Sequence, residues 1–459
     1  MATYDYDVIV IGSGAGGSIA AQQLAKKGKS VALVEAGKLG GYTSRYGGIP
    51  LQAVRYAASV YEAAKHGGKY GVRGTTVGYN YPTIKSWKDL VVKRTGVHTS
   101  EQHFLDLGIN VIQGRAYFID PHTVSVGNAR FTAREFLIAT GSELSLPEIP
   151  GLVDAGFLTP KEALELTRPP KSIAILAGSA AAYELAQLFA TFGTKVYFIE
   201  NAPGLLSQEE AEVSETIGEL FSVGYSMSIV LNGTIEAVQK VGASKKVSVL
   251  SNGKSQTILV DEVLIASARK AALDIGLENA GVAYKDYAIL TDDKLQTSAS
   301  HIFAAGSCTG QRGTPTHVAA YQSQIAAYNL SHNRAVYADY RAVPEIIYTT
   351  PEVARVGATT SELTKRRVGY KTVTVPLSLV SKANTSDFSD GFVKLIASTK
   401  TGTLLGGTVV CPNASEAIQE LTLAVQNYLS ATQVAQTLHV FSSWSEAIRV
   451  AAAKLAKLN

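Results

Sequence analysis

Cysteine is almost missing from this chain, which carries only Cys308 and Cys411 among its 459 residues. The two stand far apart and in unrelated contexts, so a framework of structural disulfides is excluded. We expect both to be small buried residues rather than reactive thiols. The same scarcity makes a cytoplasmic setting our expectation.

Long apolar runs and a strong net charge are missing as well. The longest apolar runs fall well short of a membrane span, and the first residues form no basic leader, so we expect no membrane insertion. The net charge of +4 is small for this length and gives no reason to expect a nucleic-acid partner. What remains is 46% apolar and 17% charged residues, typical of a well-packed protein of about three domains.

The first segment reads as a strand, a glycine loop, a helix and a second strand. Residues 7–11 form a short β-branched run, the pattern of a strand buried on both faces. Residues 12–17 follow at once as G-S-G-A-G-G, and a helical stretch then runs to Lys27. A second strand over residues 30–34 ends on Glu35. This order is that of a βαβ dinucleotide-binding unit.

Three glycines of this loop have distinct roles in such a unit. Gly12 permits the tight turn, Gly14 lets the backbone approach a pyrophosphate, and Gly17 lets the helix pack closely on the strand. The N-terminus of the helix offers free N–H groups and the positive end of a dipole to the phosphates. Glu35 would accept a hydrogen bond from the adenosine ribose.

A second unit of the same spacing lies further along the chain. Residues 172–176 form an apolar strand, a helical stretch follows, and the strand 196–199 ends on Glu200. The interval from Ala177 to Glu200 equals that from the first loop to its acid. The chain therefore carries two βαβ units.

The glycine positions of the second loop are occupied by Ala177, Ser179 and Ala182. A β-carbon at the first two crowds the surface where a pyrophosphate would lie. One interpretation is a Rossmann-like domain that binds nothing. The other is a weak nicotinamide site that uses Gly178, Ser179 and Glu200, where the acid favours NAD over NADP because it repels a 2′-phosphate.

Taken together, these segments resemble the pyridine nucleotide-disulfide oxidoreductases, the class of dihydrolipoamide dehydrogenase, glutathione reductase and mercuric reductase. The resemblance covers essentially the whole chain and includes further motifs at residues 139–142, 147–151, 276–282, 301–306 and 351–357. It implies an α/β fold in which an FAD domain is split around an inserted NAD domain. A C-terminal α+β dimerisation domain follows, with a homodimer whose active sites form between subunits.

The resemblance also implies domain limits and an FAD site. The limits are residues 1–150 and 273–342 for the FAD domain, 151–272 for the NAD domain and 343–459 for the dimerisation domain. The FAD-binding residues would be Gly12, Gly14, Gly17, Glu35, Thr140, Gly141, Gly306 and Ser307. At Ser307 the family has an aspartate, and the loss of that charged acceptor could weaken FAD binding by about 1–2 kcal/mol.

The cysteine pair that names the family falls on Thr43 and Gly48. The register is fixed by the flanking Gly-Gly at 40–41 and Ile-Pro at 49–50. Neither residue can form a disulfide or a thiolate. The resemblance therefore predicts a member that cannot reduce disulfides by the family's mechanism.

Other positions near the expected flavin have changed too. The family lysine that pairs with a glutamate becomes Gln52, while the glutamate remains as Glu184 and Arg45 is a candidate replacement donor. The family's G-R-x-P-N at the nicotinamide edge reads S-A-R-K-A at 267–271. In the family, these positions lie either next to the flavin, where electrons are transferred, or in the NAD-binding pocket.

The C-terminal motif H-x-H-P-T-x-S-E is altered in the same way. Phe441 holds the position of the catalytic imidazole and cannot transfer a proton, while Glu446 retains the orienting carboxylate. His439 lies two residues earlier and is expected to be structural. The end of the chain, 456–459, also lacks the cysteine pair of mercuric reductases.

Two functional hypotheses follow. In the first, the chain is an FAD-containing oxidoreductase without disulfide reductase activity. It would pass electrons from NAD(P)H through FAD to an unidentified small-molecule acceptor such as a quinone, a dye, a metal ion or oxygen. NADH would bind weakly, and no metal site is expected. In the second, the chain is a catalytically degenerate flavin-binding or structural paralogue with no NAD(P)H turnover.

Overall fold

The computed structural model describes residues 3–74, 77–310 and 315–457. The chain divides into two compact units, each of which is assembled from separate stretches of sequence. The first unit comprises Met1–Pro147, Thr159–Pro169 and Ser267–Asp339, and the second comprises Glu148–Leu158, Pro170–Ala266 and Tyr340–Asn459. Leu458 and Asn459, which belong to the expected cysteine-free end of the chain, lie outside the described residues.

The first unit is built on a sheet in the order β3-β2-β1-β6-β5-β4, with β18 beside β6. Strands β3, β2, β1, β6 and β18 run parallel, whereas β4, β5 and the beginning of β6 form an antiparallel ladder. The strands are β1 (Tyr6–Ile11), β2 (Val31–Glu35), β3 (Asn110–Gln113), β4 (Ala116–Asp120), β5 (Thr123–Val126), β6 (Ala129–Ile138) and β18 (Ile302–Ala304).

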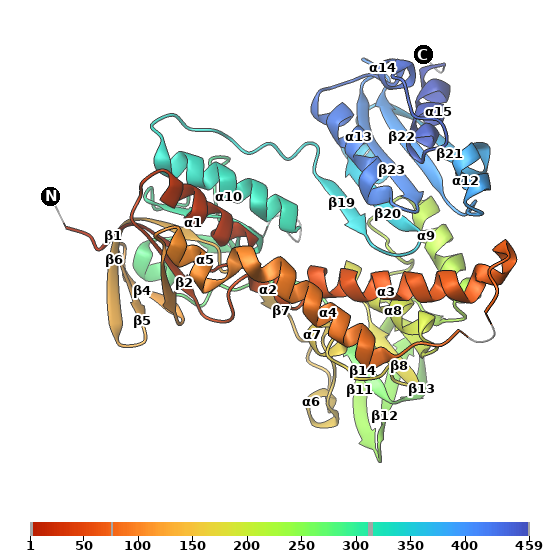
Figure 1. The fold of residues 1–459 in the computed structure, drawn as a ribbon, viewed down its shortest axis with the longest axis horizontal. Coiled ribbons are helices and arrows are strands. Elements are labelled where there is room, and N and C mark those ends of the chain that lie inside the picture. The colour runs from red at the N-terminus through yellow and green to blue at the C-terminus, as the bar shows by residue number, and fades with distance from the viewer. Residues whose placement is uncertain (1–2, 75–76, 311–314, 458–459) are drawn as a thin grey trace. The chain divides into compact units, whose positions relative to one another are not determined.

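Strand β1 is buried on both faces, as its β-branched run predicts. Val8 and Val10 pack with helices α1 (Ala15–Lys26) and α10 (Thr316–Ser331), which lie side by side in Figure 1. Ile9 and Ile11 belong to the opposite core, together with β4 and β5. Because successive side chains of a strand point to opposite faces, one short strand supplies both cores.

Shorter elements complete the first unit. Its other helices are α2 (Gly41–Arg45), α3 (Gly48–His66), α4 (Tyr81–Thr95), α5 (Glu101–Asp106) and α7 (Pro160–Ala163). Its 3-10 turns are η1 (Gly67–Tyr70), η2 (Gly96–Thr99), η4 (Leu277–Ala280) and η5 (Ser307–Thr309). Its remaining strands pair antiparallel as β7 (Ser142–Leu144) with β15 (Arg269–Ala271) and β16 (Tyr284–Lys285) with β17 (Ala288–Ile289).

The second unit begins with a parallel sheet in the order β10-β9-β8-β14. One face packs on an antiparallel sheet, β11-β12-β13, and shares a core with it. The strands are β8 (Ser172–Leu176), β9 (Lys195–Ile199), β10 (Ser228–Val230), β11 (Gly233–Val241), β12 (Ser244–Ser251), β13 (Lys254–Val260) and β14 (Glu262–Ile265). The helical elements are α6 (Leu152–Ala155), α8 (Ala180–Thr191), α9 (Ala211–Glu219) and the π-helical turn η3 (Leu220–Gly224).

The C-terminal part of the second unit is an antiparallel sheet in the order β19-β20-β23-β22-β21. Its strands are β19 (Pro344–Ile347), β20 (Glu352–Gly357), β21 (Tyr370–Pro376), β22 (Phe392–Ser398) and β23 (Leu404–Cys411). Its helical elements are α11 (Thr360–Lys365), η7 (Leu377–Leu379), α12 (Ser381–Thr385), α13 (Ala414–Gln426), α14 (Ala431–Gln436) and α15 (Ser445–Ala456).

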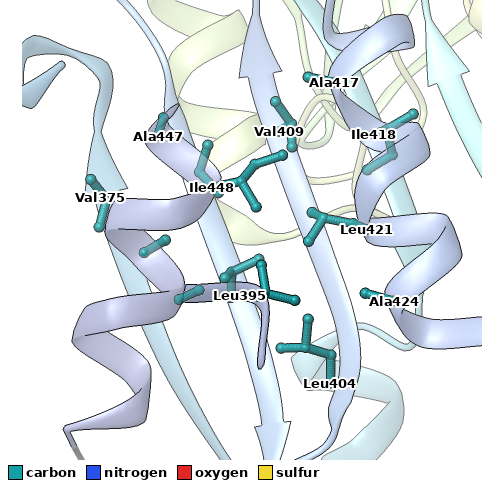
Figure 2. Packing of buried hydrophobic residues seen from close by; sticks show 14 of the residues in the cluster. Val375, Leu395, Leu404, Val409, Ala417, Ile418, Leu421, Ala424, Ala447 and Ile448 are labelled. Atoms are coloured by element: carbon teal, nitrogen blue, oxygen red, sulfur yellow. The ribbon is translucent and has the colours of Figure 1, made fainter. Parts of the chain in front are cut away.

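Helices α13 and α15 cover this sheet with apolar side chains. In α13 the buried positions recur three and four residues apart, at 414, 417, 418, 421, 424 and 425. That spacing places them on one face of the helix. Figure 2 shows Ile418 and Leu421 of α13 and Ile448 of α15 directed toward Leu395 and Val409 of the sheet.

Buried ion pairs join this sheet to the segment that leads into α9. Lys394 of β22 is buried and donates to the carboxylates of Glu210 and Glu212. Arg355 of β20 donates to Glu209 at 2.8 Å. These pairs bridge the C-terminal sheet and the parallel-sheet domain, so charges that are otherwise costly to bury are neutralised.

The fold class is the one that the sequence predicts, with two Rossmann-like parallel sheets and a C-terminal α+β domain. Strand β8 has the predicted limits, while β2 lies one residue later than expected, at Val31–Glu35. In the described part of the chain, no helix combines the length and apolarity that crossing a membrane requires.

Candidate functional site

The first glycine loop is shaped by close approaches that only glycine permits. Gly12 has a φ of +102°, and a β-carbon there would collide with the carbonyl group of Ala139. A β-carbon on Gly17 would collide with the carbonyl oxygen of Gly12. Both glycines are therefore required for the loop to fold against β1 and the end of β6.

Gly14 and Gly41 form a backbone cradle at the beginning of α1. A β-carbon on Gly41 would lie 2.5 Å from the Cα of Gly14, whereas one on Gly14 would meet no atom closer than 3.8 Å. The two segments thus approach each other through bare backbone. Helix α1 begins directly after Gly14, so the N–H groups of its first turn open toward this cradle. Such a surface suits a pyrophosphate.

Glu35 is held at the edge of this cradle by hydrogen bonds from the glycine loop. One carboxylate oxygen accepts from the backbone N–H of Ser13 at 2.8 Å and from its hydroxyl at 2.6 Å, and the other accepts from the N–H of Gly37 at 2.7 Å. The Ser13 hydroxyl also accepts from the N–H of Gly40. The motif G-x-G-x-x-G leaves the position of Ser13 free, so the sequence alone did not indicate this residue.

The other residues assigned to FAD lie at the same edge of the sheet. Thr140 and Gly141 follow the end of β6, and Gly306 and Ser307 follow the end of β18, which pairs with β6 in parallel. Carboxyl ends of parallel strands meet at one edge, and ligands of open α/β sheets bind there. The Thr140 hydroxyl donates to the carbonyl of Ala272 at 2.8 Å and so fixes this turn.

Gln322 is a buried residue of this region that the sequence did not indicate. Its amide oxygen accepts from the N–H of Gly306 at 2.7 Å, so α10 holds the turn that carries Ser307. No motif identifies such a glutamine, because its contact depends on how α10 packs.

The second loop follows a different path from the first. Its left-handed residue is Gly178, with a φ of +148°, whereas the first loop places its left-handed residue at Gly12. The Ser179 hydroxyl donates to the carbonyl of Ala266 at 2.7 Å, and Ala182 is fully buried. The side chains that replace the glycines are therefore part of the local packing.

Glu200 is more deeply enclosed than Glu35. It is 6% exposed, and its carboxylate accepts from the Tyr183 hydroxyl at 2.7 Å and from the N–H of Ala202 at 3.1 Å. Tyr183 was not among the residues that the sequence singled out. The expected ribose acid of the second unit thus has an internal partner and, unlike Glu35, is too deeply buried to meet an adenosine ribose as it stands.

The two positions that the resemblance assigns to a cysteine pair are neighbours. Thr43 lies in α2 and Gly48 begins α3, and a β-carbon on Gly48 would lie 3.0 Å from the Thr43 methyl carbon. The Thr43 hydroxyl is hydrogen-bonded to that of Thr316, while the Gln52 amide oxygen accepts from Arg55.

Cations cover two tyrosines of this same segment. The Arg269 guanidinium lies 3.9 Å from the centre of the Tyr42 ring, and the Lys161 ammonium lies 4.8 Å from that of Tyr46. Burial raises the pKa of the Tyr42 phenol. These cation–π contacts fix the aromatic rings in the segment where the family would have its thiols.

Arg45 and Glu184 each have partners of their own. The Arg45 guanidinium donates to the carbonyl of Leu39 at 2.7 Å. The Glu184 carboxylate accepts from the N–H of Tyr348 at 3.2 Å. A backbone N–H therefore supplies part of what the missing lysine would give to Glu184.

The three residues singled out in the C-terminal motif have different surroundings. His439 is bound through its ring nitrogens to Glu420 at 2.6 Å and to the carbonyl of Thr437, which are the contacts of a structural histidine. Phe441 is 76% exposed. One carboxylate oxygen of Glu446 is buried and finds no hydrogen-bond partner among the described residues.

Both cysteines are buried and protonated. Burial raises the pKa of Cys308 to about 11 and that of Cys411 to about 12. A thiol with such a pKa forms little thiolate at neutral pH, so neither is a nucleophile. No group of three or more potential metal ligands occurs within the described ranges.

Comparison with protein-family models assigns almost all of this architecture. Residues 6–323 match the model described as pyridine nucleotide-disulphide oxidoreductase. Residues 343–452 match the dimerisation domain of the same family. The chain belongs to this family.

Relatives within the pyridine nucleotide-disulphide oxidoreductase family are similar along nearly the full length of this chain. A mercuric reductase of Staphylococcus aureus is 32% identical over 455 residues, which cover 98% of this chain and 82% of the relative. A dihydrolipoyl dehydrogenase of Geobacillus stearothermophilus is 31% identical over 460 residues, covering 98% and 96%. Among solved structures, the Cu(II) complex of the HOCl-induced flavoprotein disulfide reductase RclA from Escherichia coli superposes with a TM-score of 0.87. That structure is 26% identical and is aligned over 99% of this chain and 100% of its own.

Proposed function

We propose that this family member is an FAD-containing oxidoreductase that does not reduce disulfides and passes electrons directly to a non-thiol acceptor. The observation that carries the proposal is the bare backbone at Gly14, where a β-carbon would meet no protein atom closer than 3.8 Å and yet none is present. It lies where α1 begins, and the assigned ribose acid stands beside it. A pyrophosphate lying against this backbone needs the position to stay without a side chain, whereas packing within the protein does not.

The residues present fit FAD. Glu35 is half-buried and accepts three hydrogen bonds, while a carboxylate offers about four acceptor positions, so it retains capacity for a ribose hydroxyl. The first turn of α1 would hold the pyrophosphate. Thr140, Gly141, Gly306 and Ser307 would line the remaining length. When bound, FAD supplies hydride acceptance and one-electron release, and the protein supplies binding and orientation.

The absence of an accessible thiol supports the second half of the proposal. Thr43 and Gly48 occupy the expected dithiol positions, and the thiols of Cys308 and Cys411 are buried. Disulfide exchange needs a thiolate that can reach the substrate. We therefore expect no NADH-dependent turnover of lipoamide or glutathione disulfide. Robust turnover would show that the register of residues 43–48 is wrong.

The named relatives guide the choice of acceptors. One is a mercuric reductase and another was solved as a Cu(II) complex. Metal ions therefore join quinones, dyes and oxygen as acceptors to be tried. The described residues contain no cluster of metal ligands, so we propose a metal ion only as an electron-accepting substrate and not as a resident cofactor.

We also propose that the chain acts as a homodimer through residues 343–459, with an FAD domain over 1–150 and 273–342 and a nicotinamide-binding-like domain over 151–272. The match of residues 343–452 to a dimerisation domain supports this assembly. Phe441 in place of an imidazole implies that no proton is delivered from that position.

A second candidate function is supported by one specific observation. The contact between Tyr183 and Glu200 encloses the acid that would bind the nicotinamide nucleotide. That favours a flavin-binding paralogue without NAD(P)H turnover. The two candidates differ in whether a reduced nucleotide reduces the flavin.

An anaerobic visible spectrum tests the proposal. We expect flavin bands near about 370 and 450 nm, slow bleaching of the longer-wavelength band by NADH, and weaker bleaching by NADPH. Bleaching with dithionite followed by addition of a quinone or Cu(II) tests the acceptor half independently of the nucleotide. A colourless protein that takes up no FAD would refute the proposal. A yellow protein that neither nucleotide reduces would favour the second candidate.

A further inference from the structure

The two expected ribose acids differ in what binds them. Glu35 is partly exposed and takes its hydrogen bonds from a serine and backbone groups of the loop that it faces. Glu200 is 6% exposed and takes one hydrogen bond from the hydroxyl of a tyrosine. An adenosine ribose would approach such an acid with its own hydroxyl groups as donors. The Tyr183 hydroxyl is a donor of the same chemical kind and, unlike the Ser13 hydroxyl on Glu35, it holds a carboxylate that is almost wholly buried.

Tyr183 is held firmly in this position. It lies in α8, is 3% exposed, and its ring centre lies 4.9 Å from that of Phe198 and 6.1 Å from that of Phe221. Its hydroxyl oxygen also accepts from the N–H of Leu206 at 3.0 Å. The hydroxyl is thus satisfied both as a donor and as an acceptor. Burial raises its pKa, so the phenol stays protonated and keeps donating to Glu200.

A ribose could reach Glu200 only if this arrangement opened. The hydrogen bond from Tyr183 to Glu200 would break, and an aromatic side chain packed against two phenylalanines would move. Partners of a buried charged group are costly to remove, because each group left unsatisfied loses its solvation as well. The neighbouring loop offers no compensation, since the Ser179 hydroxyl is already bound to Ala266.

We propose that Tyr183 is an internal competitor for the ribose and closes the adenosine half of the second nucleotide unit. The weak binding of NADH then depends on one hydroxyl group and not only on the missing glycines. This inference deepens the proposed function and rests on it for the identity of the nucleotide. It concerns binding alone, so it can be tested whether or not electrons are transferred.

The test is equilibrium binding of NADH to the full-length protein by isothermal titration calorimetry. Tyr183→Phe keeps the ring in the aromatic cluster and removes the competing hydroxyl. We expect this variant to bind NADH about tenfold more tightly than the unaltered protein. Tyr197→Phe is the matched control, because it removes a phenol from the adjacent strand β9 and should leave the affinity unchanged.

Glu200→Gln, alone and combined with Tyr183→Phe, completes a double-mutant cycle. In the Tyr183→Phe background it should cancel the gain, because the exposed carboxylate is then the group that the ribose uses. In the unaltered protein it should change the affinity by less than twofold, because Tyr183 and burial already keep the ribose from that carboxylate. The second measurement remains decisive even if Tyr183→Phe fails to fold, which thermal melting of each variant would show.

Three results would overturn the inference. The first is a Tyr183→Phe variant that folds but binds NADH no more tightly than the unaltered protein. The second is a tenfold loss of affinity from Glu200→Gln alone, because Glu200 would then contact the ribose despite Tyr183. The third is equal tightening by Tyr197→Phe, which would mean that the effect is not specific to the hydroxyl on Glu200.

Discussion

Single atoms distinguish the two βαβ units of this protein. In the first unit, the missing β-carbons of Gly14 and Gly41 leave bare backbone at the beginning of α1. In the second, one phenolic oxygen on Tyr183 occupies the carboxylate of Glu200. The two units have the same spacing from glycine loop to acid, yet they differ in the side chains of the loop and in the exposure of the acid.

Gly41→Ala should abolish tight FAD binding. Its β-carbon would lie 2.5 Å from the Cα of Gly14, inside the proposed pyrophosphate cradle. We expect the FAD dissociation constant to rise at least tenfold. The measurement is the ratio of flavin to protein absorbance after reconstitution with FAD and removal of the excess.

Gly281→Ala is the matched control for this substitution. Gly281 has a φ of +67°, almost equal to the +68° of Gly41, but a β-carbon there meets no atom within 4 Å. Both variants therefore carry a similar backbone strain of about 1–2 kcal/mol. Only Gly41→Ala should lose FAD, and equal retention by the two variants would contradict the cradle.

At the scale of elements, the C-terminal helices are held by one face each. Leu421 is fully buried in the core shown in Figure 2, whereas Leu423, two residues further along α13, is 63% exposed. Leu421→Ala should lower the stability of this domain by about 2–5 kcal/mol, because it leaves a cavity. Leu423→Ala should leave the midpoint of thermal unfolding nearly unchanged. Similar midpoints for both variants would mean that α13 does not pack as described.

The ion pairs of Lys394 make part of the stability dependent on pH. Burial by itself would raise the pKa of Glu212, but the hydrogen bond and charge of Lys394, together with hydrogen bonds from the backbone and Thr374, hold this pKa below the ordinary value of 4.5. A carboxyl group with a lowered pKa stabilises the folded state above that ordinary value, and the contribution is lost as the pH falls through the lowered one.

Glu212→Gln should therefore unfold at a lower temperature than the unaltered protein at pH 7. The difference should shrink as the pH is taken below about 4.5. Because Glu212 is partly exposed, the effect will be modest. Thermal unfolding at a series of pH values measures it, with Glu215→Gln on the same helix as the control. A difference that grew toward acid pH would have the wrong sign for this ion pair.

Some features of the fold and of the candidate site could be predicted from the sequence, and others could not. The limits of β8 followed from a run of apolar residues, and the place of Glu200 followed from its interval to Ala177, because local periodicity and loop length fix both. The contact of Tyr183 with Glu200 could not be predicted, since it depends on how α8 packs against β9. The same holds for Gln322 and Gly306, and for Arg269 over Tyr42, whose partners are distant in sequence.

At the scale of the whole molecule, the C-terminal domain carries three exposed apolar side chains in one short segment. Leu438, Val440 and Phe441 are 99%, 77% and 76% exposed, in the segment between α14 and α15. Large apolar side chains exposed together mark interaction sites. This segment falls within the match to a dimerisation domain, so a second copy of the chain is the expected partner.

Light scattering should therefore report a dimer at micromolar concentration. Replacing Leu438 and Phe441 by serine should weaken the dimer at least tenfold, since their apolar area would no longer be buried. Leu423→Ser, an exposed leucine elsewhere in the same domain, is the control and should leave the dimer intact. A monomeric unaltered protein at this concentration would count decisively against the assembly.

The pairing of β18 with β6 has a consequence for biosynthesis. Ile302 lies beside Phe136 in the finished sheet, although most of the second unit's parallel-sheet domain is translated between them. At ordinary elongation rates this delay is on the order of 10 to 30 seconds. During that time one edge of β6 has no neighbouring strand, and α1 awaits α10. The nascent chain thus carries an open strand edge and an uncovered helix face until synthesis passes residue 331, and a ribosome-bound chaperone would protect both during this interval.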